Sequence, residues 1–267
     1  MQPIVPVSAF NDNYIWVWNE GSSNQAVVVD PGDAAPVIAY LEKQGLTLHA
    51  ILITHHHNDH TGGIDDLLAL ATKHGWQVPV FGPKNSRITQ ITDALSEGES
   101  IQIFDQRVEV INLPGHTLDH IGFYCADQEA LFCGDTLFRA GCGRLFEGSP
   151  EQMFQSLARL MELPADTKVF AAHEYTLSNL AFAQAAEPEN LAVKAAVEHD
   201  KAKRENNMPT LPSTLSQERE INPFLRTTSP SLITTVQQEA ERLGNMDHLP
   251  STAVEVFAFL REWKNRF

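Results

Sequence analysis

A short stretch in the first quarter of the chain concentrates side chains that can bind metal ions. Residues 54–63 read THHHNDHTGG and hold five potential ligands within six positions. Imidazole nitrogens and carboxylate oxygens suit zinc, iron and manganese. His55 and His57 are two residues apart, so an extended chain places both on one side, whereas Asp59 and His60 lie past a bend and can face a second point nearby. The spacing therefore favours two adjacent metal ions over a solvated polar loop.

Further ligands must come from elsewhere, because a zinc site needs three or four protein ligands. His116 in PGHT, Asp135 in CGDT and His173 in AHEY each follow a predicted strand. In α/β architectures the carboxyl ends of strands converge on sites, so the three together indicate a shared centre, although each alone is a weak signal. His56 and His120 are expected to pack or hydrogen-bond beside the site without binding metal. Asp30 ends a predicted strand and is expected either to orient the histidine loop by a hydrogen bond or to act as a plain cap.

The elements that position these residues alternate between strand and helix patterns up to about residue 173. Strands are predicted at 13–18, 26–30, 50–54, 77–81, 107–113, 121–126, 130–134 and 168–172. Helices are predicted at 34–44, 62–74 and 150–161. Beyond Tyr175 helical periodicity takes over with no convincing strand, and 207–229 reads as a connecting loop with one short helix.

Composition limits the classes of partner. The chain has 267 residues, 43% of them hydrophobic, and a formal charge of −15, which is the wrong sign for nucleic acid or an anionic membrane. An anionic small substrate would need a local basic cluster. The chain has no long apolar run, and its start lacks the features of a signal peptide, so we expect a cytoplasmic protein. The three cysteines show no metal-binding or disulfide spacing and are expected to be inert thiols.

The order and spacing of THHHNDHTGG, PGHT, CGDT and AHEY resemble the metallo-β-lactamase superfamily. This resemblance covers residues 1–173 and implies an α+β fold, an αββα sandwich, as the catalytic domain. It also implies two divalent metal ions, with zinc as the first choice and iron or manganese as alternatives. The implied ligands are His55, His57 and His116 for one metal, Asp59, His60 and His173 for the other, and Asp135 as the bridge between them.

The remaining features resemble glyoxalase II within that superfamily. Residues 141–148, GCGRLFEG, resemble its substrate loop, and residues 174–267 resemble its helical C-terminal domain that binds the glutathione substrate. The resemblance implies five substrate-binding positions: Arg144, Phe146, Tyr175, Arg261 and Lys264. Phe146 departs from the tyrosine of some members, which puts one glutathione contact in doubt. Solvated surface charge is the alternative for the three basic residues.

The resemblance implies hydrolysis of the thioester S-D-lactoylglutathione to D-lactate and glutathione, the second step of methylglyoxal detoxification. A hydroxide bridging the metals would attack the carbonyl, with Asp59 and Asp135 as the catalytic residues. We expect a monomer that acts on a small glutathione thioester, with no nucleic acid or membrane partner. The alternatives are lactone or β-lactam hydrolysis, sulfur dioxygenation at a single iron, and a non-enzymatic metal-binding protein.

Overall fold

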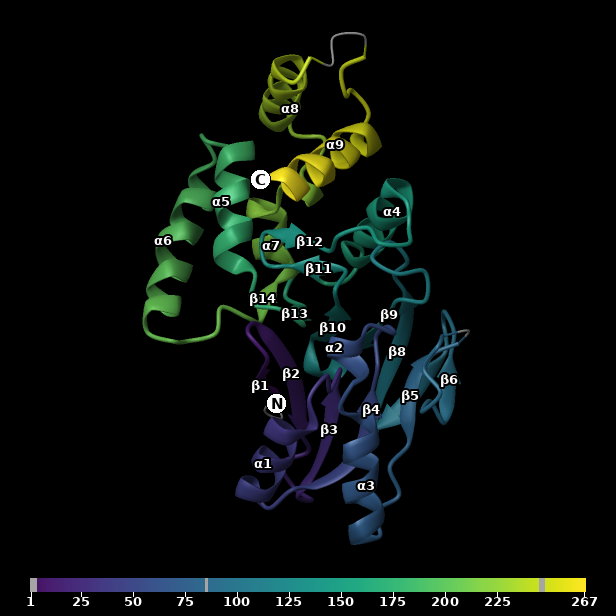
Figure 1. The fold of residues 1–267 in the computed structure, drawn as a ribbon. Helices are drawn as coiled ribbons and strands as arrows, with labels where there is room; N and C mark the ends of the chain where they lie inside the picture. The colour runs from purple at the N-terminus through teal and green to yellow at the C-terminus, as the bar shows by residue number, and fades with distance from the viewer. Residues whose placement is uncertain (1–3, 85, 245–247) are drawn as a thin grey trace.

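Two six-stranded β-sheets form the centre of the structure, a computed structural model that describes residues 4–84, 86–244 and 248–267 (Figure 1). Residues 1–3, where the first predicted domain begins, lie outside the described residues. The first sheet contains, in spatial order, β1 (Ile4–Ala9), β2 (Asn13–Asn19), β3 (Gln25–Val29), β4 (Thr47–Leu52), β5 (Val80–Pro83) and β6 (Asp93–Leu95). The second contains β14 (Ser213–Thr214), β13 (Lys168–Ala171), β10 (Ala130–Gly134), β9 (Ile121–Cys125), β8 (Gln106–Asn112) and β7 (Ser100–Ile103). A separate hairpin pairs β11 (Leu137–Phe138) with β12 (Gly141–Cys142).

Strand β2 shows why the sheets stack. Its residues alternate between two apolar environments, since successive side chains of a strand point to opposite faces. Trp16 and Trp18 enter the core shared with the second sheet, whereas Ile15 and Val17 pack in the cluster that includes helices α1 (Ala34–Gln44) and α3 (Ile64–His74). Both faces are therefore buried, which is why the strand reads as an almost unbroken apolar run.

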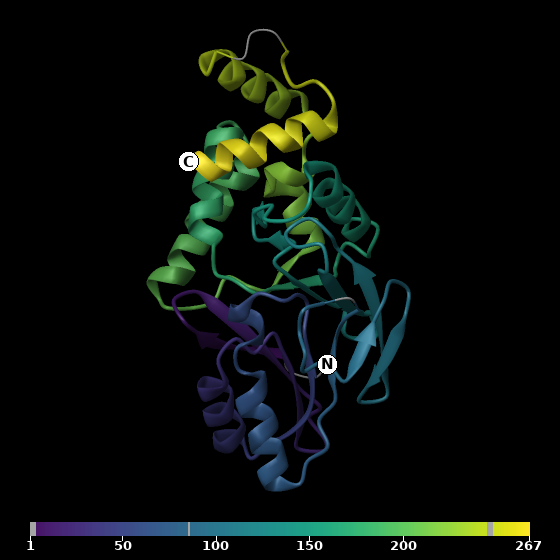
Figure 2. The ribbon, with the colours of Figure 1, turned by 45° about the vertical axis from the view of Figure 1, so that its right-hand side comes forward.

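The remaining helices gather at the opposite end of the molecule from α1 and α3 in both views (Figures 1 and 2). They are α4 (Pro150–Leu160), α5 (Thr176–Ala186), α6 (Leu191–Glu205), α7 (Leu215–Ile221), α8 (Pro230–Arg242) and α9 (Ala253–Arg266), with the short α2 (Asn58–Thr61) beside the sheets and 3-10 turns at Ala126–Gln128 and Pro223–Leu225. Ser149 begins α4 with a capping box to Gln152, followed by Pro150, as the Ser-Pro pair predicts. No helix in the described ranges is long and apolar enough to cross a membrane.

The predicted mixed α and β fold with a helical C-terminal region is confirmed, but the prediction missed several short strands. The largest omission is β1, and the clearest error concerns the C-terminal third, where no strand was expected. Strand β14 pairs antiparallel with β13 through Lys168 opposite Thr214 and Val169 opposite Ser213. Two residues carry no periodic signal, so only the available sheet edge makes this segment a strand. The division at 173 and 174 stays a prediction.

Loops at one edge of the sheets approach each other closely enough to require glycine. A Cβ on Gly32, just after β3, would lie 1.8 Å from the carbonyl oxygen of Asp59, and a Cβ on Gly63 would lie 2.5 Å from the Ala34 nitrogen. A side chain at either glycine would push the loops apart. The glycines therefore let the loop after β3 pack directly on the segment that carries the histidine motif.

Candidate metal centre

The loop after β4 carries four of the seven predicted ligands. Thr54, His55 and His60 are fully buried, and His57 is the N-cap residue just before α2. The chain is extended as far as His57 and then turns into α2, so Asp59 and His60 lie on the helical turn. The strand-to-bend geometry expected from the sequence is therefore present.

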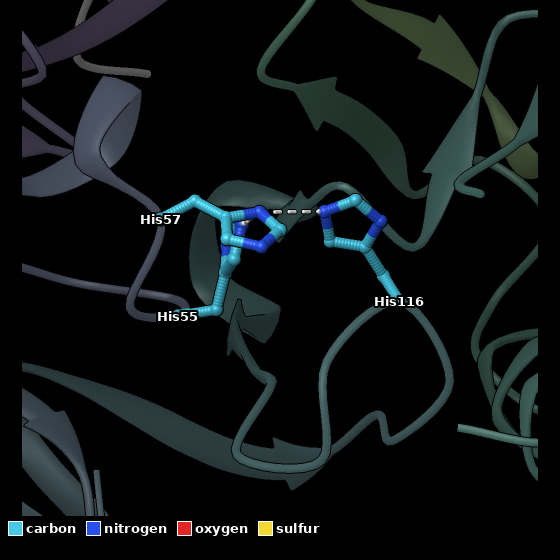
Figure 3. A group of neighbouring side chains, drawn as sticks. All are labelled: His55, His57 and His116. Carbon is cyan, nitrogen blue, oxygen red and sulfur yellow. Dashed lines mark hydrogen bonds between the residues drawn. The ribbon is translucent and has the colours of Figure 1, made fainter. Parts of the chain in front are cut away.

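Three histidines converge on the first point of the site (Figure 3). His57 Nδ1 lies 3.1 Å from His55 Nε2 and 3.0 Å from His116 Nε2. Burial lowers the pKa of all three imidazoles, so they are neutral and offer lone pairs. His116 donates its Nδ1 hydrogen to the Arg144 carbonyl over 2.8 Å, and this leaves its Nε2 as a lone pair that faces the other two rings.

A second point lies between Asp59, His60 and His173. Asp59 Oδ2 is 3.5 Å from His60 Nε2 and 3.4 Å from His173 Nε2. The buried carboxylate of Asp135 lies between the two points. Its Oδ1 is 3.5 Å from His60 Nε2 and 3.3 Å from His173 Nε2, and its Oδ2 is 3.4 Å from His116 Nε2. The structure thus brings all seven predicted ligands together in two adjoining groups, which we call the metal centre.

Several atoms of the metal centre have no hydrogen-bond partner among the described residues. Among the described residues, His60 Nε2, His173 Nε2 and Asp135 Oδ1 are buried without a hydrogen bond. Such atoms are costly to bury unless something binds them. Burial alone would lower the pKa of the two histidines, but the surrounding carboxylates, Asp135 first among them, together outweigh it and raise the pKa of His60 to about 10 and that of His173 to about 11. The negative field and the convergent nitrogens fit a divalent metal ion.

The outward-facing ring nitrogens are held by oxygen acceptors, which fix the tautomers. Asp30 accepts the Nδ1 hydrogen of His60 over 3.0 Å, the Thr54 hydroxyl over 2.7 Å and the Thr54 amide over 2.8 Å. The Thr54 hydroxyl in turn lies 3.0 Å from His55 Nδ1. Asp30 therefore orients the histidine loop and is more than a cap. His173 hydrogen-bonds to Asp12, a residue that sequence reasoning missed because a turn between strands carries no ligand-spacing signal.

Two other histidines lie beside the metal centre, as expected. His120 stacks on His55 with ring centroids 4.7 Å apart and accepts the backbone N–H of Asp135 over 3.1 Å. Burial lowers its pKa to about 3, so it serves as a neutral acceptor. His56 points to the opposite side of the loop and pairs with Asp119 at 2.9 Å.

A cavity of about 730 Å³ opens onto the metal centre. It is lined by five metal-centre residues together with all five predicted substrate residues: His57, Asp59, His116, Asp135 and His173 with Arg144, Phe146, Tyr175, Arg261 and Lys264. Phe146 is 64% exposed at the rim, where its ring is 5.5 Å from that of His57. Gly143 allows this loop to pass the metal centre, since a Cβ there would lie 2.0 Å from the Asp135 carbonyl oxygen.

The three basic residues of the cavity differ in their surroundings. Arg144 is exposed, whereas Arg261 is only 5% exposed and donates to the Cys142 carbonyl over 2.7 Å, which excludes solvated surface charge for Arg261. Lys264 donates to the Ser178 carbonyl over 2.7 Å. Burial, with Arg261 and Arg144 nearby, lowers the pKa of Lys264 to about 8. The cavity thus combines three cationic groups with the metal centre in a chain of net negative charge.

Comparisons with known proteins match two parts of the chain to different family models. Residues 8–173 match the metallo-β-lactamase superfamily, and residues 174–267 match the hydroxyacylglutathione hydrolase C-terminus. Hydroxyacylglutathione hydrolases of Chromohalobacter salexigens and Vibrio parahaemolyticus are 52% and 51% identical, each aligned over 100% of both chains.

Solved structures share the fold at lower identity. The B3 metallo-β-lactamase BLEG-1 is 25% identical with a TM-score of 0.60, and the alignment covers 84% of this chain and 99% of that one. TTHA1623 in a di-iron-bound form is also 25% identical, with a TM-score of 0.59 and coverage of 84% and 100%. The fold is therefore that of the metallo-β-lactamase superfamily, and the cluster of His and Asp side chains indicates a divalent metal site.

Proposed function

The chain belongs to the hydroxyacylglutathione hydrolase family, and on that premise we propose that it hydrolyses S-D-lactoylglutathione to D-lactate and glutathione, the second step of methylglyoxal detoxification. One observation on this chain's own residues supports the proposal. One cavity joins Asp135 and His173, two metal-centre residues with atoms that lack a hydrogen bond, to three cationic side chains. A glutathione thioester needs both, because it presents a reactive carbonyl and free carboxylates.

We propose that the metal centre holds two divalent ions, zinc in the first place, with iron or manganese as alternatives. His55, His57 and His116 would bind one ion, Asp59, His60 and His173 the other, and Asp135 would contact both. Ions bound there supply a nucleophile from water at neutral pH and polarise the thioester carbonyl. The ligand types accept all three metals, so availability in the cell would decide among them.

The chain's own residues bind and orient the substrate around that centre. We assign the glutathione carboxylates to Arg144, Arg261 and Lys264, whose charges offset the acidic field of the protein. Asp59, a catalytic residue with Asp135, is 43% exposed and lines the cavity, so its carboxylate is placed to take up the proton released from the attacking water. No strong acid is needed for the leaving group, because a thiol has a pKa of about 8.5 and departs as thiolate.

In this scheme residues 1–173 supply the metal ligands and residues 174–267 supply Tyr175, Arg261 and Lys264. Tyr175 stacks on His173 with ring centroids 4.7 Å apart, so it can place substrate beside the second group of ligands. Cytoplasmic location and a monomeric state remain predictions from the sequence.

The test is hydrolysis of S-D-lactoylglutathione by purified protein, followed by loss of the thioester absorbance, with metal content measured on the same sample. We expect turnover with about two metal ions per chain and loss of turnover in a chelated sample, restored by added zinc. A β-lactam and a lactone serve as control substrates. Full metal content without thioester turnover would contradict the proposed substrate, and undiminished turnover after complete metal removal would contradict the proposed metal centre.

A further inference from the structure

Backbone hydrogen bonds join the segment between β1 and β2 to the residues on either side of His173. Tyr14 donates its backbone N–H to the Ala172 carbonyl over 2.7 Å, and Glu174 donates its own to the Asp12 carbonyl over 2.8 Å. An isolated β-bridge pairs Asn13 with His173. These backbone contacts fix the turn against His173 whatever side chains stand at positions 12 and 13.

Asp12 in this turn and Asn13 at the start of β2 each contact one ligand of the second group. Asp12 Oδ1 accepts the Nδ1 hydrogen of His173 over 2.9 Å, so Nε2 faces Asp59 and Asp135 and is the nitrogen available to a metal ion. Asn13 donates its amide to Asp59 Oδ2 over 3.2 Å and to the Asp59 carbonyl over 3.3 Å. Asp59 is 43% exposed, so this amide adds to the contacts with His60 and His173 in restraining the rotation of its carboxylate.

We propose that Asp12 and Asn13 are positioning residues that orient His173 and Asp59 toward a divalent metal ion. The inference rests on the proposed function only in that Asp59, His60 and His173 hold such an ion. Hydrogen bonds of this kind fix the tautomer and ring direction of a metal-binding histidine, and their loss weakens metal binding. Asp12 is not itself among the residues that line the cavity, so it acts through His173.

The effect is confined to one half of the metal centre. His60 is oriented by Asp30, and the first group is oriented by Thr54 and the Arg144 carbonyl. None of these contacts involves the turn. Loss of the Asp12 side chain therefore removes the hydrogen bond that orients His173 and leaves the orientation of the first group unchanged.

Zinc binding tests the proposal independently of catalysis. Metal-free wild type, Asp12→Ala, Asp12→Asn and Asn13→Ala are titrated with zinc against a competing chelator, with Asp66→Ala, an exposed acid on α3, as control. We expect Asp12→Ala to bind one of two zinc ions about 10- to 100-fold more weakly and the other unchanged. Asp12→Asn keeps an oxygen acceptor and should lose markedly less. Asn13→Ala should weaken the same ion.

Kinetics on zinc-loaded protein add a second readout. For Asp12→Ala we expect a lower kcat with little change in KM, since the cationic residues that bind substrate are untouched. Wild-type affinity for both zinc ions in Asp12→Ala would overturn the proposal. Equal losses of zinc affinity in Asp12→Asn and Asp12→Ala would also overturn it, because they would assign the effect to the charge of Asp12 and not to its hydrogen bond. A wild-type protein that binds two zinc ions without hydrolysing the thioester would instead contradict only the proposed substrate.

Discussion

Two clusters of histidine and carboxylate lie on opposite sides of the loop after β4, and they differ in whether their potential ligand atoms have hydrogen-bond partners. The metal centre lies on one side. On the other, His56, Asp119 and Glu147 form what we call the outer cluster, whose potential ligand atoms also lie within 4.8 Å of one another. His56 stands between His55 and His57 in an extended chain, so the alternation of side chains sends it to the opposite face.

Every carboxylate oxygen of the outer cluster already has a donor. Asp119 accepts from Ser86 over 2.6 Å and from Thr117 over 2.7 Å, besides its contact with His56. Glu147 accepts from Arg87 over 2.9 Å and from the Leu118 N–H over 2.9 Å. The metal centre, by contrast, buries three atoms that have no hydrogen-bond partner in the described protein. Residue type alone therefore does not define a metal site; unsatisfied convergent atoms do.

The largest effect should follow from removing the carboxylate shared by both groups of the metal centre. Asp135→Ala should lower kcat by about a thousandfold, since several kcal/mol of stabilisation by the metals would be lost. Metal content should fall with it. Asp135→Asn keeps the shape without the charge and should remain impaired. Turnover is measured by loss of the thioester absorbance. Near-normal turnover in either variant would contradict the conclusion that the metal centre, unlike the outer cluster, binds catalytic metal ions.

A smaller effect is expected at the buried end of the cavity. Arg261→Ala should raise KM by about tenfold or more, because a charged hydrogen-bonding partner of the substrate is lost. It should also lower the melting temperature, since the Cys142 carbonyl would be left unpaired. Arg266→Ala is the matched control on the same helix, where the guanidinium is exposed and pairs with Glu262. Equal KM values for the two variants would contradict a substrate role for Arg261.

The pH dependence of KM should report Lys264. Its pKa of about 8 lies below the ordinary lysine value, so its ammonium loses its proton as the pH rises through about 8. Above that pH the attraction for substrate carboxylates is lost, and KM should rise a few-fold while kcat stays level, the size expected for a partly exposed ion pair. Lys264→Arg keeps its charge at all these pH values and should abolish the rise. An unchanged pH profile in Lys264→Arg would assign the titration to another group.

The smallest effect should come from the outer cluster. Glu147→Gln keeps an acceptor for the Leu118 N–H and removes only charge that faces Arg87 and His56. Zinc per chain should be unchanged, kcat should vary by less than about twofold, and stability should fall by at most about 1 kcal/mol, the range of partly exposed ion pairs. Loss of a bound metal ion in this variant would show that the outer cluster also binds metal.

Much of the fold was predictable because it depends on local patterns. Helix α1 occupies the predicted residues 34–44, and β10 the predicted residues 130–134. Strands of two or three residues, such as β14 and β6, were missed because they are too short for any period to show. The predicted strand at 77–81 lies instead at Val80–Pro83, where pairing with β4 and β6 sets its limits.

The sequence by itself determined which residues could bind metal and that a strand and a bend would present them in two sets, because ligand type and side-chain alternation are local properties. Tertiary structure decided which of their atoms remain unpaired, that Asp30 and Asp12 hold the histidines, and that Arg261 lies buried against Cys142. Asp12 and His173 are 161 residues apart in the chain. A hydrogen bond over that separation depends on how the two sheets pack, and no local pattern encodes it.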